Sequence, residues 1–479
     1  MDETKGNNSL KNILYNVIYL FFGNIVTKLL GAVATMIYIR YSGAENYGIL
    51  SIALAFSVIV VFFTDAGIGQ TTIREGTKKN SDLASIMYSY IKVRIGLSIV
   101  IAICSVVFIL ISYQNEPEKK YAILALTLPT ILGGAMQSIG TIYFQIVEKM
   151  KKILFINVAS SLGMSLVLIM GVYFNFNIVL LCFSYGFANV IVGIYSIFLV
   201  TREIKITKKM NPMIFDQLLI FAMNGIIVML IPQVGPLILD KILTTKELGY
   251  YAAAFKIPSV LYQFPGVIAM AFYPRLFHLG NEKNYEEHRA MSGFELKSMS
   301  ILGGILALPL IVSPKFWIVK LLTEDMAPAV PGLVFLSYLI FLQALKYPLA
   351  DFLTTVGRQK GRTIVMFIGL LTSISLYIFL GLNFGLVGGA LAPVIAEIVI
   401  ILGCILLIPK GISYFIENTF VIVIMFILSI LCYYLFFSEI HPLLGITIIE
   451  CFFIGSVLGL QKDLRESVTV IIKGIRCNN

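Results

Sequence analysis

The stretch YGILSIALAFSVIVVFFT, residues 47–64, runs for eighteen residues without a charged side chain. Glu45 and Asp65 are the nearest charged residues on its two sides. A helix that crosses the hydrocarbon core of a bilayer needs about 20 predominantly apolar residues. The stretch is therefore predicted to span a membrane, and runs of the same kind recur along the whole chain.

The composition agrees with many such spans. Of the 479 residues, 58% are hydrophobic and only 13% are charged, and the mean hydropathy is +0.91. Soluble domains have roughly 25% charged residues, so this chain has about half the charge that a water-facing surface requires. The composition excludes a cytosolic enzyme with a membrane anchor, a secreted protein and a nucleic-acid binder.

Apolar runs separated by short polar breaks predict an all-α integral membrane protein with about fourteen transmembrane helices. The longest break, about twenty residues around Arg275–Gly293, is too short for a soluble catalytic domain, and we expect no enzyme activity. We divide the chain into an N-terminal lobe of six helices (1–205), a C-terminal lobe of six helices (206–410), and two extra helices with a cytoplasmic tail (411–479). The predicted helices cover residues 12–40, 47–73, 87–112, 121–147, 153–173, 178–200, 214–240, 249–273, 297–319, 330–355, 363–381, 386–408, 417–436 and 443–460.

Lysine and arginine are distributed unevenly between the two ends of these predicted helices. Of the 36 basic residues, 26 fall on the side of the N-terminus and seven on the opposite side. Loops rich in lysine and arginine stay in the cytoplasm, so both termini of this multi-pass protein are predicted to lie on the cytoplasmic side of the cytoplasmic membrane. The net charge of +10 is then a topology signal, and no nucleic-acid partner is expected.

Two pairs of segments suggest an internal repeat. Glu45–Gly48 is similar to Glu247–Tyr250, about 200 residues later, and Phe176–Val179 is similar to Phe384–Val387, 208 residues later. With six helices in each copy, both copies enter the membrane from the same side, which is the parallel-repeat plan of many secondary transporters. Chance similarity between helix starts that are rich in small residues is the alternative.

Three lysines, each inside a predicted helix, are counted on neither side. A charge near the centre of a bilayer costs at least about 2.5–3.5 kcal/mol on insertion scales unless it faces a cavity or a partner. Cations without an obvious acid partner suit an anionic substrate such as a phosphate or pyrophosphate. The alternatives are an ion pair with an acid on another helix or, for the lysine nearest a helix end, an extended side chain that reaches the headgroups. The three lysines are Lys28, Lys346 and Lys256, and the acids are Asp65, Asp240, Asp351 and Glu397.

Acidic and amide side chains also fall inside the predicted helices. Glu397 lies mid-helix, where burial favours protonation, so it is the candidate for ion coupling, with a structural partner of a lysine as the alternative. Asp65, Arg74 and Asp351 are candidate gate or motif residues. Amides are candidates for contacts with sugar hydroxyls, with hydrogen bonds between helices as the alternative. The amide candidates are Asn24, Gln70, Gln137, Asn224, Gln233 and Gln343.

The segment Tyr41–Gly48, followed by an apolar helix and then by Thr64–Glu75, resembles the start of the bacterial and archaeal polysaccharide repeat-unit flippases of the Wzx type. That family shows a glycine, then Tyr-Gly, and later an Asp-x-Gly stretch that leads to Arg-Glu. Leu248–Phe255, with Phe272–Leu276, resembles its second marked segment. This chain departs from the family in having Ser-Gly where Leu-Gly is usual, and in two helices beyond the twelve of many relatives.

The resemblance implies a MATE-like fold of the multidrug/oligosaccharidyl-lipid/polysaccharide exporter superfamily. It further implies alternating-access translocation of undecaprenyl-pyrophosphate-linked oligosaccharide repeat units for cell-surface polysaccharide synthesis. The implied partners are that glycan lipid, membrane lipids, a polysaccharide polymerase and glycosyltransferases. An ion-coupled multidrug exporter and a lipid II flippase are the alternatives. Neither a P-loop pattern nor cysteine and histidine at metal spacing occurs, so no cofactor is expected besides H⁺ or Na⁺ as a coupling ion.

Overall fold

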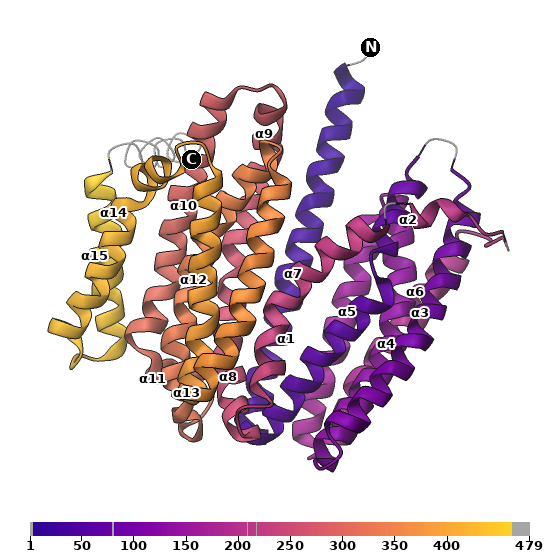
Figure 1. Ribbon diagram of the computed structural model, residues 1–479, viewed down its shortest axis with the longest axis horizontal. Coiled ribbons are helices and arrows are strands. Elements are labelled where there is room, and N and C mark those ends of the chain that lie inside the picture. Colours follow the sequence, from indigo (N-terminus) through magenta and orange to yellow (C-terminus); the bar gives the residue numbers. More distant parts are fainter. Residues whose placement is uncertain (1–2, 79–80, 208, 217, 462–479) are drawn as a thin grey trace, which may run out of the picture. The chain divides into compact units, whose positions relative to one another are not determined.

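The computed structural model describes residues 3–78, 81–207, 209–216 and 218–461 (Figure 1). In these ranges the chain forms helices joined by turns and contains no β-strand. Ten of the helices are long and apolar enough to cross a membrane. The predicted fold class, an all-α protein with many membrane spans, is therefore confirmed.

The chain forms two compact units, Met1–Ala253 and Ala254–Asn479. The lobe boundaries predicted from the repeat, at residues 205 and 410, stay predictions. In the first unit α1 packs against α4 and α5, and α4 packs along α6. This unit contains α1 (Glu3–Asp65), α2 (Ile68–Gly76), α3 (Leu83–Ser112), α4 (Pro117–Ile146), α5 (Met150–Tyr173), α6 (Ile178–Thr201), the 3-10 helix η1 (Pro212–Phe215), α7 (Leu218–Leu239) and the first half of α8 (Thr245–Leu261).

In the second unit α10 packs against α12 and α14, and α12 packs along α13. The two last helices, which exceed the predicted lobes, belong to this packing: α14 and α15 lie beside α10 (yellow in Figure 1). The unit contains the rest of α8, α9 (Gln263–Asn281), α10 (Tyr285–Val312), α11 (Pro314–Leu321), the 3-10 helix η2 (Glu324–Ala329), α12 (Val330–Thr355), α13 (Gln359–Leu407), α14 (Gly411–Cys432), the π-helix η3 (Tyr433–Phe437) and α15 (Pro442–Leu460).

Two pairs of predicted helices are each one long helix with a break at a single glycine. α1 is interrupted at Gly43 (φ 79°, ψ 175°) and α13 at Gly385 (φ 57°, ψ −133°). A residue with a Cβ atom is strained at such positive φ, whereas glycine adopts it freely. When α1 and α13 are each counted as two spans, and α7 and the bent pair α8 and α9 are added, the described helices agree with about fourteen predicted spans.

The prediction that a long connection between helices lies around Arg275–Gly293 is wrong. α9 continues to Asn281 and α10 begins at Tyr285, so both helices extend through this charged segment. An ion pair between Arg275 and Glu287 at 2.5 Å joins them. Hydropathy measures how favourably a segment transfers into lipid. A charged helix end that lies outside the bilayer therefore has the hydropathy of a loop. The predicted helix 249–273 is also divided, because α8 ends at Leu261 and α9 begins at Gln263.

The two segments of the first predicted repeat pair pack directly against each other in the first unit. A Cβ atom on Gly48 would lie 2.2 Å from the carbonyl oxygen of Thr245, and one on Gly249 would lie 1.8 Å from that of Ala44. Both neighbours are backbone atoms, which cannot rotate away. The glycines thus permit a close crossing of α1 and α8 that resembles the small-residue contacts of membrane helices.

Replacement of Gly249 by alanine is expected to destabilise the first unit. The added methyl group meets a backbone carbonyl, and overpacking of this kind costs typically about 1–3 kcal/mol. The matched control is Gly96→Ala in α3, where a Cβ atom meets nothing within 4 Å. Thermal unfolding of the purified proteins in detergent checks the prediction, and equal unfolding temperatures for the two variants would contradict it.

Candidate functional site

Lys346 and Glu397 form an ion pair inside the second unit. Nζ of Lys346, on α12, lies 2.7 Å from Oε1 of Glu397, on α13, and the two side chains are only 12% and 5% exposed. The premise that Lys346 has no acid partner is therefore wrong. Its partner is 51 residues away in sequence and becomes a neighbour only because α12 packs along α13. The assignment of Lys346 to substrate binding stays a prediction.

Aromatic side chains surround this ion pair. Nζ of Lys346 lies 5.6 Å from the centre of the Tyr347 ring, and Tyr262 lies within electrostatic range of Glu397. α9 approaches closely at Gly266, where a Cβ atom would be 3.3 Å from the Tyr347 ring. A lysine and a carboxylate are thus held among phenol groups, which accept and donate hydrogen bonds without adding charge at neutral pH.

Lys28 and Lys256 differ from Lys346 because neither has an acid partner in the described part of the chain. Lys28, on α1 of the first unit, is exposed. Lys256, on α8 of the second unit, is half-buried, and only its backbone carbonyl accepts a hydrogen bond, from Ser259. Within the described residues, these two lysines therefore keep the property on which the prediction rested, the lack of an acid partner.

Asp65 ends α1 and is held by a buried arginine. Nη1 of Arg94, on α3, lies 3.0 Å from Oδ1 of Asp65. The Tyr90 hydroxyl and the backbone N–H of Gly69 each donate to the carboxylate at 3.3 Å. Gly67, with φ 83°, turns the chain between α1 and α2 so that Gly69 faces Asp65. The Asp-x-Gly stretch therefore builds a helix junction.

Arg74, at the end of α2, ties this junction to the segment that precedes α7. Its guanidinium lies 3.0 Å from Glu75 and 3.3 Å from Asp216, and it donates to the backbone carbonyl of Asp216. Burial raises the pKa of Glu75, but hydrogen bonds from Lys78 and Arg74 outweigh it and leave the pKa below its usual value. Glu75 is therefore ionised, and the Arg-Glu motif is a fixed charge cluster.

The amide candidates divide into three groups. Gln137, on α4, donates to Asn189 of α6 at 2.9 and 3.1 Å, and the Ser160 hydroxyl of α5 donates to the same Asn189 side chain at 2.9 Å. Gln137 therefore makes hydrogen bonds between helices, which was the alternative to a contact with sugar hydroxyls. Asn24 and Asn224 have side chains that lie outside the described residues. Gln70 is exposed and Gln233 and Gln343 are half-buried, and none of these three has a hydrogen-bond partner within the described ranges.

Comparison with known proteins identifies the family of the chain. The family model described as "Polysaccharide biosynthesis protein" matches residues 13–279, more than half of the chain. The chain belongs to this family. The resemblance expected from the motifs at residues 41–75 and 248–276 is therefore confirmed. No curated protein matches the chain.

Solved structures show the fold of this polysaccharide biosynthesis protein. A lipid II flippase MurJ in an inward closed conformation has a TM-score of 0.75 and 17% identity, with 93% of this chain and 99% of that chain covered. An inward-facing MATE multidrug transporter has a TM-score of 0.66 and 12% identity, with coverage of 81% and 95%. A MOP superfamily transporter from Pyrococcus furiosus has a TM-score of 0.60 and 13% identity, with coverage of 83% and 94%. The predicted MATE-like fold is confirmed.

Several charged residues of this family member were missed or misplaced by sequence reasoning. Arg94 is one of the 26 basic residues counted on the side of the N-terminus, yet it is buried against Asp65. Lys119 was counted as a loop lysine on the opposite side, yet it is buried and lies 3.1 Å from Asp240. Glu295 was placed in a loop, yet it is fully buried in α10. Both of its carboxyl oxygens lack a hydrogen-bond partner in the described structure.

Asp351 lies near Glu295 in the second unit. It is buried on α12, and Glu295 and Arg362 are within electrostatic range of it. The Arg362 guanidinium donates to the Thr354 hydroxyl at 2.6 Å. The structure therefore places Asp351 among charged groups of α10, α12 and α13, and its role as a gate residue stays a prediction.

Removal of the charges of Lys346 and Glu397 tests whether their ion pair stabilises the fold. Lys346→Met alone leaves a buried carboxylate without its cation, and loss of one partner of a buried pair costs about 3–5 kcal/mol. The double variant Lys346→Met with Glu397→Leu removes both charges, and such replacements are often neutral. We expect thermal unfolding to show a large loss for the single variant and recovery in the double variant. Equal losses in both would contradict a coupled pair.

Proposed function

We propose that this protein is a flippase that moves undecaprenyl-pyrophosphate-linked oligosaccharide repeat units across the cytoplasmic membrane by alternating access. The observation that carries the proposal is that Lys28, inside an apolar candidate span, and Lys256, on α8, have no acid partner among the described residues. Such cations are costly in a bilayer, and a diphosphate that passes them offsets this cost. Membership of the polysaccharide biosynthesis family supports a glycan as the cargo.

The Lys346 and Glu397 pair provides a way to link the anion to a coupling ion. A diphosphate that approaches Lys346 competes with the carboxylate for the same ammonium group. Once Glu397 loses its cation, we propose that H⁺ takes the place of the ammonium group as the neutralising charge. Binding of the anionic lipid and uptake of H⁺ then favour the same rearrangement, and a ligand shifts a conformational equilibrium only by binding the two states unequally. Na⁺ at the freed carboxylate is the alternative coupling ion.

The amides that have no hydrogen-bond partner among the described residues suit the glycan. Gln70, Gln233 and Gln343 each carry a donor and an acceptor, which is what sugar hydroxyls require. No covalent bond changes in this transport step, so the protein acts as a carrier and not as an enzyme. Glycosyltransferases supply the repeat unit on the cytoplasmic side, where both termini are proposed to lie, and a polymerase consumes the flipped product.

Two alternative cargoes differ from the proposed glycan lipid, one in its charge and the other in its headgroup. A multidrug exporter that moves cationic compounds is disfavoured because Lys28 and Lys256 repel cations. A lipid II flippase is favoured by one observation, the similarity in fold to the lipid II flippase MurJ. Lipid II and a glycan repeat unit share the polyprenyl diphosphate, so competition between the two lipids for transport decides which headgroup is preferred.

Removal of the unpaired cations is expected to impair transport without harming the fold. Lys28→Gln and Lys256→Gln are each expected to lower surface polysaccharide roughly tenfold or more, because a hydrogen bond to a charged group contributes about 1.5–3 kcal/mol. The matched control is Lys315→Gln, an exposed lysine on α11. Surface glycan is measured at equal membrane abundance of each variant. Normal glycan in both variants would remove these residues from the site.

The proton-coupling step predicts a change in pH dependence. Glu397→Gln cannot take up a proton, so the rate of flipping in reconstituted vesicles is expected to lose its dependence on pH. The wild-type rate is expected to change with pH. An unchanged pH profile in the variant would show that Glu397 has a purely structural role.

A further inference from the structure

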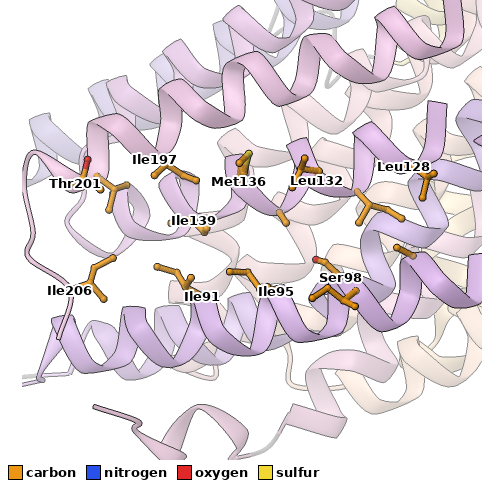
Figure 2. Close-up of a pocket in the computed structure, with 15 residues that line it drawn as sticks. Ile91, Ile95, Ser98, Leu128, Leu132, Met136, Ile139, Ile197, Thr201 and Ile206 are labelled. Atoms are coloured by element: carbon orange, nitrogen blue, oxygen red, sulfur yellow. The ribbon is translucent and has the colours of Figure 1, made fainter. Parts of the chain in front are cut away.

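A groove of about 540 Å³ runs along the surface of the first unit between α3, α4 and α6 (Figure 2). Ile91, Ile95 and Ser98 follow one another along α3 on one side of it, and Leu128, Leu132 and Met136 follow one another along α4. Ile206 and Thr201 lie at one end and Leu128 at the other. The groove contains none of the charged residues discussed above, so it is a separate feature from the candidate transport site.

The lining is almost entirely hydrocarbon. Thirteen of its fifteen residues are apolar, and the two polar ones, Ser98 and Thr201, donate their hydroxyl hydrogens within their own helices, to the carbonyls of Arg94 and Phe198 at 2.7 and 3.0 Å. No free polar group of the described lining points to a sugar, a phosphate or a peptide as the occupant. A surface of this kind favours an alkyl chain, because burial of a polar group without a partner is unfavourable.

The groove is open to the bilayer. In α3 only 11% of the most apolar eighteen-residue window is buried, so this helix presents most of its surface to lipid. Ile91 and Ala102 mark the ends of its groove-lining face. At 1.5 Å per residue they are about 17 Å apart, close to half of the roughly 30 Å hydrocarbon core. The groove therefore fits one acyl chain within one leaflet, and an undecaprenyl chain is much longer than one leaflet is thick.

Cations gather where the groove ends at Ile206 and Thr201. Arg202 and Lys205 are adjacent to these two residues in sequence, and Lys92 lies on α3 one turn before Ile95. All three side chains are exposed, and none forms an ion pair within the described residues.

The nearest acid in sequence, Glu203, does not neutralise these cations. It is bound by Lys149 at 2.7 Å and by Lys152, which hold its pKa below the usual value. An excess of positive charge therefore remains at the end of the apolar groove. Basic clusters at this depth attract anionic lipid headgroups.

We propose that the groove binds one acyl chain of an anionic glycerophospholipid, whose headgroup phosphate contacts Lys92, Arg202 and Lys205. The lipid belongs to the leaflet on the side of these cations. It is a resident ligand of α3, α4 and α6 and is distinct from the transported molecule. This inference does not depend on the proposed cargo, because it rests on the shape of the groove and on the charge at its end.

A tryptophan reporter tests the occupant directly. Trp317 is the single tryptophan of the chain, so Trp317→Phe gives a dark background. Leu132→Trp then places a reporter in the groove, where Leu132 is 51% exposed and leaves room for the larger ring. Ile103→Trp is the matched control, since Ile103 is 60% exposed on α3 and does not line the groove. Each protein is reconstituted with phosphatidylglycerol or phosphatidylcholine that carries brominated chains, which quench nearby tryptophan.

The expected result is stronger quenching at position 132 by brominated phosphatidylglycerol than by brominated phosphatidylcholine. Each basic side chain is expected to contribute up to about fivefold to the relative binding constant. The preference is expected to vanish in the variant Lys92→Gln, Arg202→Gln, Lys205→Gln, and quenching of either kind is expected to fall when Ala102→Phe fills the groove. At position 103 the two lipids are expected to quench equally.

Three results would overturn the proposal. The first is equal quenching by both lipids at position 132, which would show an ordinary lipid contact. The second is a preference for phosphatidylglycerol that survives removal of the three cations, which would place the anionic headgroup elsewhere. The third is quenching at position 103 with none at position 132, which would show that no chain enters the groove. Unfolding temperatures of the variants establish that each protein is folded.

Discussion

A charged side chain inside an apolar helix needs a partner, and this constraint organises the structure. Most of the buried charges meet it by pairing within their own unit: Arg94 with Asp65 and Lys119 with Asp240 in the first unit. Lys346 pairs with Glu397 in the second unit. The pairs join neighbouring helices and keep net charge out of the hydrocarbon. Among the described residues Lys28 and Lys256 have no acid partner, so no ion pair found there offsets the cost of their charge.

The fold was predictable from the sequence because hydropathy acts locally. An apolar run such as residues 47–64 predicts a membrane span by itself, whatever the rest of the chain contains. The breaks in the two longest helices were also predicted, because Gly43 lies between the predicted helices 12–40 and 47–73, and Gly385 lies between 363–381 and 386–408. The charged ends of α9 and α10 were read as a loop, since hydropathy does not distinguish a solvated helix from an irregular segment.

The ion-pair partners of the buried charged residues could not be predicted from the sequence, for a different reason. Glu397 and Lys346 are 51 residues apart, and only the packing of α12 along α13 brings them together. Arg94 lies inside the predicted helix 87–112 and was counted among the basic residues on the side of the N-terminus, although it is buried. Glu295 was assigned to the wrongly predicted connection and so was never considered as an intramembrane acid. Ion pairs between helices depend on tertiary contacts, which a single sequence does not reveal.

The family links the chain to polysaccharide biosynthesis and the fold is MATE-like, while the proposed cargo depends on Lys28 and Lys256. The most direct measurement uses purified protein in vesicles that contain a fluorescent polyprenyl-diphosphate oligosaccharide in one set and a cationic dye in another. The account predicts protein-dependent movement of the anionic glycan lipid to the opposite leaflet and no movement of the dye. Transport of the dye without movement of the glycan lipid would contradict it.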